Sequence, residues 1–165
     1  MATIRFKQTT TATPEQFTAG LTDFGPGRSK LFGNSADDYL KVHDKGPDQA
    51  DVTEGSKGIW ERLHYDWSNP DRVVLTTTDS NTWGGGSGHT YTFTRRPDGE
   101  TDIDYVMVRE GKNIKGRLLG LVVGTVGRRS LAKAFGNAVK AIEARNNGAR
   151  TTGSSAEGAQ SPRSE

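Results

Sequence analysis

The stretch IWERLHYDW, residues 59–67, alternates so regularly between apolar and polar positions that it predicts a β-strand. One face carries Ile59, Leu63, Tyr65 and Trp67 together with a single acid, Glu61. The opposite face is mostly charged, and turning the strand over would bury three ionisable side chains instead of one. Glu61 is therefore predicted to point into the protein.

Strand-like runs of this kind fill the chain from residue 39 to residue 110, and turn-forming residues separate them. Because no helical pattern lies between them, we expect an antiparallel meander, preceded by a first strand in TIRFKQTTT, residues 3–11. The six later runs are YLKVHDK (39–45), ADVTE (50–54), IWERLHYDW (59–67), RVVLTTTD (72–79), HTYTFTRR (89–96) and TDIDYVMVRE (101–110).

The last hairpin allows a prediction of register. RPDGE, residues 96–100, fits a type I turn with a left-handed glycine, so that Arg96 faces Glu100 and Tyr91 faces Tyr105. In this register the inward faces of both strands carry mainly aromatic and aliphatic side chains, which supports the register. They carry His89, Tyr91 and Phe93 on one strand and Ile103, Tyr105 and Met107 on the other.

Helical patterns flank this strand-rich region. Thr13 and Gln16 have the spacing of a capping box, with Pro14 at the first helical position, and RSKLF at 28–32 predicts a second short helical turn. After Gly111 the pattern becomes helical again, with apolar residues at helical spacing in its second half. These are Leu131, Phe135, Val139 and Ile142. The first half is rich in glycine, which leaves open whether the helix is continuous there.

The composition is typical of a small soluble protein. The 165 residues include no cysteine, which excludes disulfides and favours the interior of a cell. There is no secretory signal at the N-terminus, and the longest apolar stretch, residues 118–127, is about half of the roughly 20 residues that a membrane span needs. We therefore predict a cytoplasmic protein, with one domain over residues 1–146 and a disordered tail over 147–165.

A strand, two short helices, six antiparallel strands and a long C-terminal helix follow one another in the predicted order. This order, with the stretches TTTATPEQFTAGLTDF (9–24), GIWERLHYDWSNPDRVVL (58–75) and KAFGNAVKAIEAR (133–145), resembles the START-like superfamily and its polyketide cyclase/dehydrase-like members. The resemblance implies an α+β helix-grip fold. A curved antiparallel seven-stranded sheet would wrap around the long C-terminal helix, with two short helices after the first strand.

The resemblance also implies a cavity between the sheet and the C-terminal helix. Such a cavity would hold a small hydrophobic or aromatic molecule, lipid-like or polyketide-like, in a binding or carrier protein. The alternative is a cyclase or dehydratase that uses Glu and Tyr side chains of the pocket and no metal. No catalytic residue common to the superfamily can be assigned to this sequence, and no cofactor is expected.

The inward-facing pattern gives the candidate ligand-binding residues. Glu61 is expected either to orient a ligand hydroxyl or act as a general base, or to pair with Arg109 or water. Trp83, beside three glycines, is expected to be a hinged flap over the cavity mouth or to pack on its rim. The full set is Glu61, Leu63, Tyr65, Trp83, His89, Tyr91, Phe93, Tyr105, Met107 and Arg109.

Other chemistries are disfavoured. The three histidines lack the short paired spacing of metal ligands, and His64 should point to solvent. GGGSGH, residues 84–89, matches neither a nucleophile elbow nor a phosphate-binding loop.

The charge pattern bears on macromolecular partners. The net charge is only +2, so no nucleic acid partner is expected, although basic residues collect after residue 114. A solvated basic face is the first interpretation of Arg117, Arg128 and Arg129, and transient contact with a membrane surface is the second. The sequence does not determine the oligomeric state.

Overall fold

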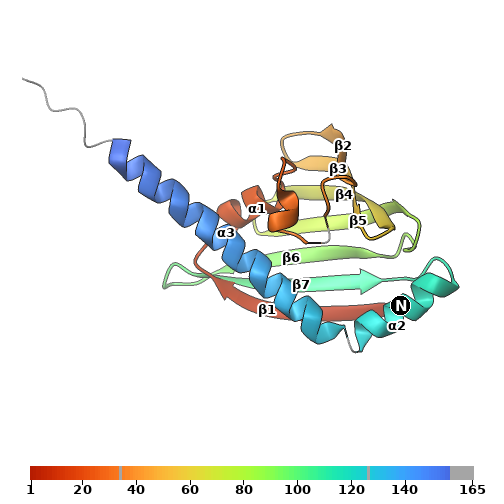
Figure 1. Cartoon of the computed structure of the whole chain (residues 1–165). Coiled ribbons are helices and arrows are strands. Elements are labelled where there is room, and N and C mark those ends of the chain that lie inside the picture. Colours follow the sequence, from red (N-terminus) through yellow and green to blue (C-terminus); the bar gives the residue numbers. More distant parts are fainter. Residues whose placement is uncertain (34, 126, 157–165) are drawn as a thin grey trace, which may run out of the picture.

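The computed structural model describes residues 1–33, 35–125 and 127–156, and its largest element is a curved antiparallel sheet (Figure 1). Within these residues the sheet has seven strands, as predicted, and their order is β1-β7-β6-β5-β4-β3-β2. The strands are β1 (Ala2–Thr10), β2 (Lys41–Lys45), β3 (Gln49–Ser56), β4 (Ile59–Asn69), β5 (Arg72–Ser80), β6 (Gly88–Arg95) and β7 (Thr101–Arg109).

The predicted register of the last hairpin is confirmed. Tyr91 pairs with Tyr105, and the backbone N–H of Arg96 donates to the carbonyl of Glu100 at 2.8 Å. Gly99 supplies the left-handed residue of the turn, with φ of 87°. The alternating side chains of β6 and β7 therefore reach the inner face of the sheet, as the sequence pattern indicates.

Two short helices follow β1 and start the cover of the inner face. Helix α1 (Pro14–Leu21) begins with the predicted capping box, in which Thr13 and Gln16 satisfy each other's backbone N–H groups. Its Phe17 and Leu21 are buried. A 3-10 turn, η1 (Arg28–Lys30), comes next and places Arg28 inside the protein.

Helix α3 (Arg128–Ala156) crosses the inner face of the sheet (Figure 1). Phe135, Val139 and Ile142 are buried on its sheet-facing side, as predicted, and Leu131 is half-buried. The helix comes so close to α1 that a Cβ atom on Gly20 would lie 3.0 Å from Ile142 Cγ1. The sheet thus grips α3 through these apolar contacts.

The C-terminal boundary differs from the prediction. We predicted a disordered tail from residue 147, but α3 continues to Ala156. Extending an existing helix costs less than starting one, so α3 propagates from its packed part into this segment. The rest of the predicted tail, residues 157–165, lies outside the described residues.

The glycine-rich half of the C-terminal region forms a separate helix, α2 (Ile114–Gly124). Asn113 caps it by accepting a hydrogen bond from the Gly116 N–H at 2.8 Å. Gly116 is needed for close packing, because a Cβ atom there would lie 2.3 Å from the carbonyl oxygen of Thr82. The glycines therefore bring α2 against the loop between β5 and β6.

Candidate ligand-binding site

A cavity of about 430 Å³ lies between the inner face of the sheet and α3. Residues of β1 and β3–β7, the segment 28–33 and the start of α3 line it. Its volume is within the range of small-molecule sites.

Aromatic rings form the middle of the cavity wall. Phe135 of α3 stacks on Tyr105 with ring centroids 5.0 Å apart, and Phe6 of β1 stacks on both rings at 6.1 Å. The ring centroids of Tyr91 and Tyr105 are 4.7 Å apart. Flat apolar surfaces of this kind favour an aromatic or otherwise hydrophobic occupant.

The structure brings nine of the ten predicted site residues to the cavity wall. These are Glu61, Leu63, Tyr65, Trp83, His89, Tyr91, Tyr105, Met107 and Arg109. Phe93 is the exception, because its ring packs edge-on against Phe17 of α1 at 5.5 Å and belongs to the core beyond the cavity. The alternation of side chains in β6 correctly predicted that Phe93 points inward. At this end of β6, however, α1 fills the space next to Phe93, so the ring does not reach the cavity.

At one end of the cavity Glu61 forms a buried ion pair with Arg109. Arg109 Nη1 donates to Glu61 Oε1 at 2.9 Å, and the hydroxyl of Thr77 donates to the same oxygen at 2.8 Å. A register shift between β4 and β5 places Thr77 opposite Leu63 and so next to Glu61. Glu61 and Arg109 are each only 8% exposed, so water solvates neither charge well. Each charge is stabilised mainly by the other.

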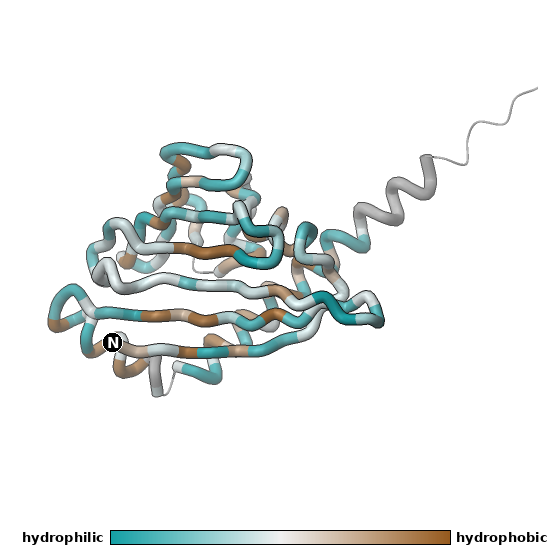
Figure 2. Tube along the Cα trace, turned by 180° about the vertical axis from the view of Figure 1, so that it is seen from behind, coloured by the Kyte–Doolittle hydropathy of each residue, from teal (hydrophilic) through white to brown (hydrophobic). Residues whose placement is uncertain are grey.

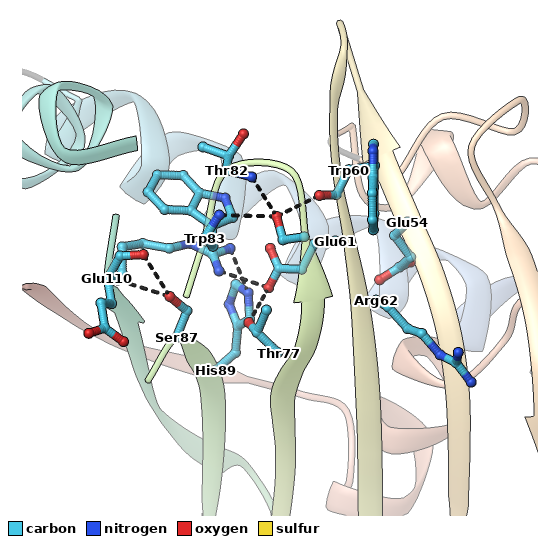
Figure 3. A network of polar contacts seen from close by, with 12 residues as sticks. Glu54, Trp60, Glu61, Arg62, Thr77, Thr82, Trp83, Ser87, His89 and Glu110 are labelled. Carbon is cyan, nitrogen blue, oxygen red and sulfur yellow. Dashed lines mark hydrogen bonds and ion pairs between the residues drawn. The ribbon is translucent and has the colours of Figure 1, made fainter. Parts of the chain in front are cut away.

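His89 links this ion pair to Tyr105. Figure 3 shows His89 beside Glu61 and Thr77. His89 Nε2 lies 2.8 Å from Arg109 Nη2, which only donates, so Nε2 is the acceptor and the ring proton sits on Nδ1. Nδ1–H then donates to the Tyr105 hydroxyl oxygen at 2.6 Å. Burial, and next the positive charge of Arg109, lower the pKa of His89 well below its ordinary value, which keeps the imidazole neutral.

This arrangement predicts a specific loss of stability in mild acid. The pKa of His89 is lowered in the folded protein, so its contribution to stability is present above pH 6.5, the ordinary value, and falls as the pH drops below it. We expect the free energy of unfolding in urea to decrease between pH 6.5 and about pH 5. His89→Gln should remove most of this decrease, whereas His43→Gln, at an exposed position on β2, should retain it. Equal pH dependence in the wild type and His89→Gln would contradict the assignment.

A second buried polar cluster was not predicted from the sequence. Arg28 Nε donates to Glu54 Oε1 at 2.5 Å, Ser35 donates to the same oxygen at 2.7 Å, and the Tyr65 hydroxyl donates to Oε2. Arg28 also donates to the carbonyl oxygens of Leu21 and Asp23. Every polar group of this cluster has a partner, which indicates a structural role.

The sequence did contain a signal for part of this second cluster. Ala50, Val52 and Glu54 alternate in β3 as Ile59, Glu61 and Leu63 do in β4, and Glu54 pairs directly with Glu61 across the two strands. The same parity rule therefore turns both acids inward. Each acid has its own arginine.

Burial suppresses ionisation of the tyrosines in the cavity. It is the largest cause of the raised pKa values of Tyr65, Tyr91 and Tyr105, and the carboxylate of Glu54 adds to the effect at Tyr65. All three therefore keep their hydroxyl protons at neutral pH. Because the Tyr105 oxygen already accepts from His89, its own O–H group is available as a donor.

Trp83 packs into the wall of the cavity. It is 6% exposed, its backbone N–H donates to Ser80 Oγ at 3.1 Å, and it forms a β-bridge with Gly111 (Figure 3). Its ring lies 5.0 Å from the Arg109 guanidinium, a cation–π contact. The hydrogen bonds of the adjacent loop, including Gly84 N–H to the Glu110 carbonyl at 2.8 Å, hold it in this position.

The other two histidines lie away from the cavity. His64 faces outward on β4, as predicted, with Nδ1 3.4 Å from Asp51, and His43 on β2 is hydrogen-bonded to Thr53. Among residues 1–33, 35–125 and 127–156, no cluster of His, Asp and Glu has the geometry to hold a metal ion.

Comparison with solved structures identifies the fold. TTHA0849 from Thermus thermophilus is similar with a TM-score of 0.66 at 14% identity, over 87% of this chain and 98% of that one. A START superfamily protein from Mycobacterium smegmatis gives 0.64 at 12% identity, over 86% and 99%. The fold is the START-like helix-grip fold. A third similar structure, the Zhui aromatase/cyclase from Streptomyces sp. R1128, gives a TM-score of 0.60 at 13% identity, over 87% of this chain and 94% of that one.

At such low identities these structural similarities establish the fold alone. The sequence itself matches no protein-family model and no curated protein.

Proposed function

We propose that this chain binds and carries a small hydrophobic or aromatic molecule, lipid-like or polyketide-like, inside the cell. The observation that supports this best is the composition of the cavity: aromatic and aliphatic walls, with polar groups concentrated in two internally neutralised clusters. A cavity of this kind gains by burying an apolar ligand. Its buried charges are paired, and Lys57, which is exposed to solvent, is the lining charge outside the two ion pairs.

The cluster around Arg109 favours binding over catalysis. A general base needs a free lone pair, and Arg109 occupies the one on His89 Nε2. Arg109 and Thr77 both donate to Glu61 Oε1, so within this cluster only Glu61 Oε2 could act as a base. The hydrogen-bond donor that remains available in this cluster is the Tyr105 O–H group. It would select a ligand with a carbonyl or hydroxyl oxygen at one end of an apolar body.

The first test is identification of the small molecules that co-purify with the native protein, by extraction and mass spectrometry. An apolar compound with one oxygen-bearing end is the expected result. Absence of any bound apolar compound, together with failure of the naphthalene probes described next, would overturn the proposal.

The second test uses two ligands of matched shape. Acetylnaphthalene carries a carbonyl oxygen that ethylnaphthalene lacks, so the wild type should bind the former more tightly through Tyr105. Tyr105→Phe should weaken acetylnaphthalene binding about tenfold and leave ethylnaphthalene binding unchanged in a fluorescence titration. Tyr39→Phe is the matched control, because its hydroxyl accepts from Gly58 N–H outside the cavity. Equal loss for both ligands would rule out recognition of the oxygen.

A cyclase or dehydratase remains the second candidate. The His89–Tyr105 hydrogen bond is the observation that favours it, since it joins two proton-carrying groups inside the cavity. One of the similar structures is an aromatase/cyclase, which is consistent with this alternative. Single-turnover conversion of an aromatic polyketide, lost in His89→Gln and Tyr105→Phe, would establish it.

A further inference from the structure

Helix α2 carries its large apolar side chains on the side that faces solvent. Ile114 is 78% exposed, Leu118 60%, Leu121 66% and Val122 55%, and this spacing places them on one side of the helix. We call these four residues the α2 face. Figure 2 colours the trace by hydropathy and shows α2 as brown segments beside the N-terminus. An apolar helix face without cover in a water-exposed position indicates an interaction surface.

The α2 face is a consequence of how the helix packs. Its inward side is formed by Gly116 and Gly120, which are buried and lie against Thr82 and Trp83. Since glycines occupy the contact with the body of the protein, the four large side chains of the α2 face are left on the outside. They contribute little to the folding of this chain, so folding does not explain why they are apolar.

Cations border the α2 face, and acids are missing from the surrounding sequence. Lys115 and Arg117 on α2 are exposed, as are Arg128 and Arg129 at the start of α3. Between residues 111 and 142 the sequence contains no Asp or Glu. Apolar side chains flanked by cations match the interface of an anionic bilayer, in which acyl chains lie beneath negative headgroups.

We propose that the α2 face docks on an anionic phospholipid membrane, with the helix lying in the plane of the interface. A second copy of the chain fits less well, because a two-fold contact through α2 would bring these cations together without an acid to compensate them. Across residues 1–33, 35–125 and 127–156, no helix combines the length and apolar character that a membrane crossing requires. Docking is therefore peripheral.

The docked orientation places the membrane beside the cavity. A Cβ atom on Gly120 would lie 4.0 Å from the Trp83 ring, and Trp83 lines the cavity next to Arg109. One residue thus separates α2 from the polar end of the cavity. The docking surface itself does not depend on what the cavity holds, because none of its four residues lines the cavity.

Vesicle co-sedimentation tests this proposal. The wild type should bind vesicles of phosphatidylcholine and phosphatidylglycerol in equal parts, more weakly at high salt, and should bind pure phosphatidylcholine vesicles poorly. Leu118→Ser combined with Leu121→Ser should lower the partition coefficient about tenfold or more, and Lys115→Gln combined with Arg117→Gln should lower it on mixed vesicles. Val42→Ser, at an exposed apolar position on β2, is the matched control and should bind as the wild type does.

Three results would overturn the proposal: no binding to mixed vesicles, unchanged binding by the leucine double variant, or a dimer in sedimentation equilibrium that this variant dissociates without any vesicle binding. The acetylnaphthalene titration keeps the two proposals apart. The leucine double variant should retain wild-type affinity for acetylnaphthalene, so loss of docking is distinguishable from failure of the cavity to bind.

Discussion

Phe135→Ala is expected to lower the free energy of unfolding by about 3–5 kcal/mol. Phe135 is 9% exposed and its ring contacts Phe6, Tyr91 and Tyr105, which belong to three different strands. Truncation would remove the buried ring and extend the existing cavity into the contact between α3 and the sheet. Urea unfolding followed by circular dichroism gives the free energy, provided that the slope with denaturant stays unchanged.

Lys133→Ala provides the control for Phe135→Ala. Lys133 lies on the same helix at an exposed position, so its truncation should change the free energy of unfolding by no more than about 0.5 kcal/mol. A loss below about 1 kcal/mol in Phe135→Ala would mean that α3 is not held to the sheet by this ring.

The fold was predictable because its local signals agree. Alternation in the strands, the capping box at Thr13, the RPDGE turn and the apolar spacing of 131–142 each have a short-range physical cause, and all are present in the structure. Register in the last hairpin followed from the turn, since a slip by one residue would have turned Tyr91 and Tyr105 to the outer face.

The pairing of buried charges was less predictable. Strand parity turns Glu61 and Glu54 inward, but the choice of arginine depends on contacts distant in sequence. Arg109 was among the expected partners of Glu61, because both lie on inward-facing strand positions. Arg28 lies on a 3-10 turn in a segment without periodicity, so no sequence pattern indicated that its side chain enters the core.

The position of Trp83 and the end of α3 show two further limits. Glycines beside Trp83 suggested mobility, but hydrogen bonds from this loop to Ser80 and Glu110, which no spacing reveals, hold it in place. Residues 147–156 lack large apolar side chains and most of them are poor helix formers, which suggested disorder, but α3 propagates into them from its packed part. Composition describes what a segment can bury and not whether a preceding helix continues into it.

Glu61→Leu is expected to destabilise the protein by about 3–5 kcal/mol. A buried polar group that is kept only for function would be expected to gain stability on replacement by leucine. The ion pair reverses that expectation, because removal of Glu61 leaves the Arg109 guanidinium, 8% exposed, without a counter-charge. Thr77 would lose its acceptor as well. Urea unfolding at neutral pH measures the loss.

An ion pair on the protein surface provides the control for the loss of stability expected in Glu61→Leu. Arg96 and Glu100 are 3.7 Å apart with side chains 41% and 42% exposed, so Glu100→Leu should change the free energy of unfolding by less than about 1 kcal/mol. An equal effect of Glu61→Leu and Glu100→Leu would show that the Glu61–Arg109 pair is screened by water and contributes no more than a surface contact.

The double variant Glu61→Leu/Arg109→Met separates stability from recognition. It leaves no buried charge at this end of the cavity, and apolar side chains of similar volume often replace a buried ion pair with little loss. It should therefore recover most of the stability that Glu61→Leu alone removes. His89 would lose the arginine donor that fixes its Nδ1–H tautomer, and Tyr105 would no longer be held as a donor to the ligand. The recovered protein should therefore bind acetylnaphthalene no better than ethylnaphthalene. Recovery of stability together with undiminished preference for acetylnaphthalene would make the ion pair a purely structural element of the cavity, with Tyr105 acting alone.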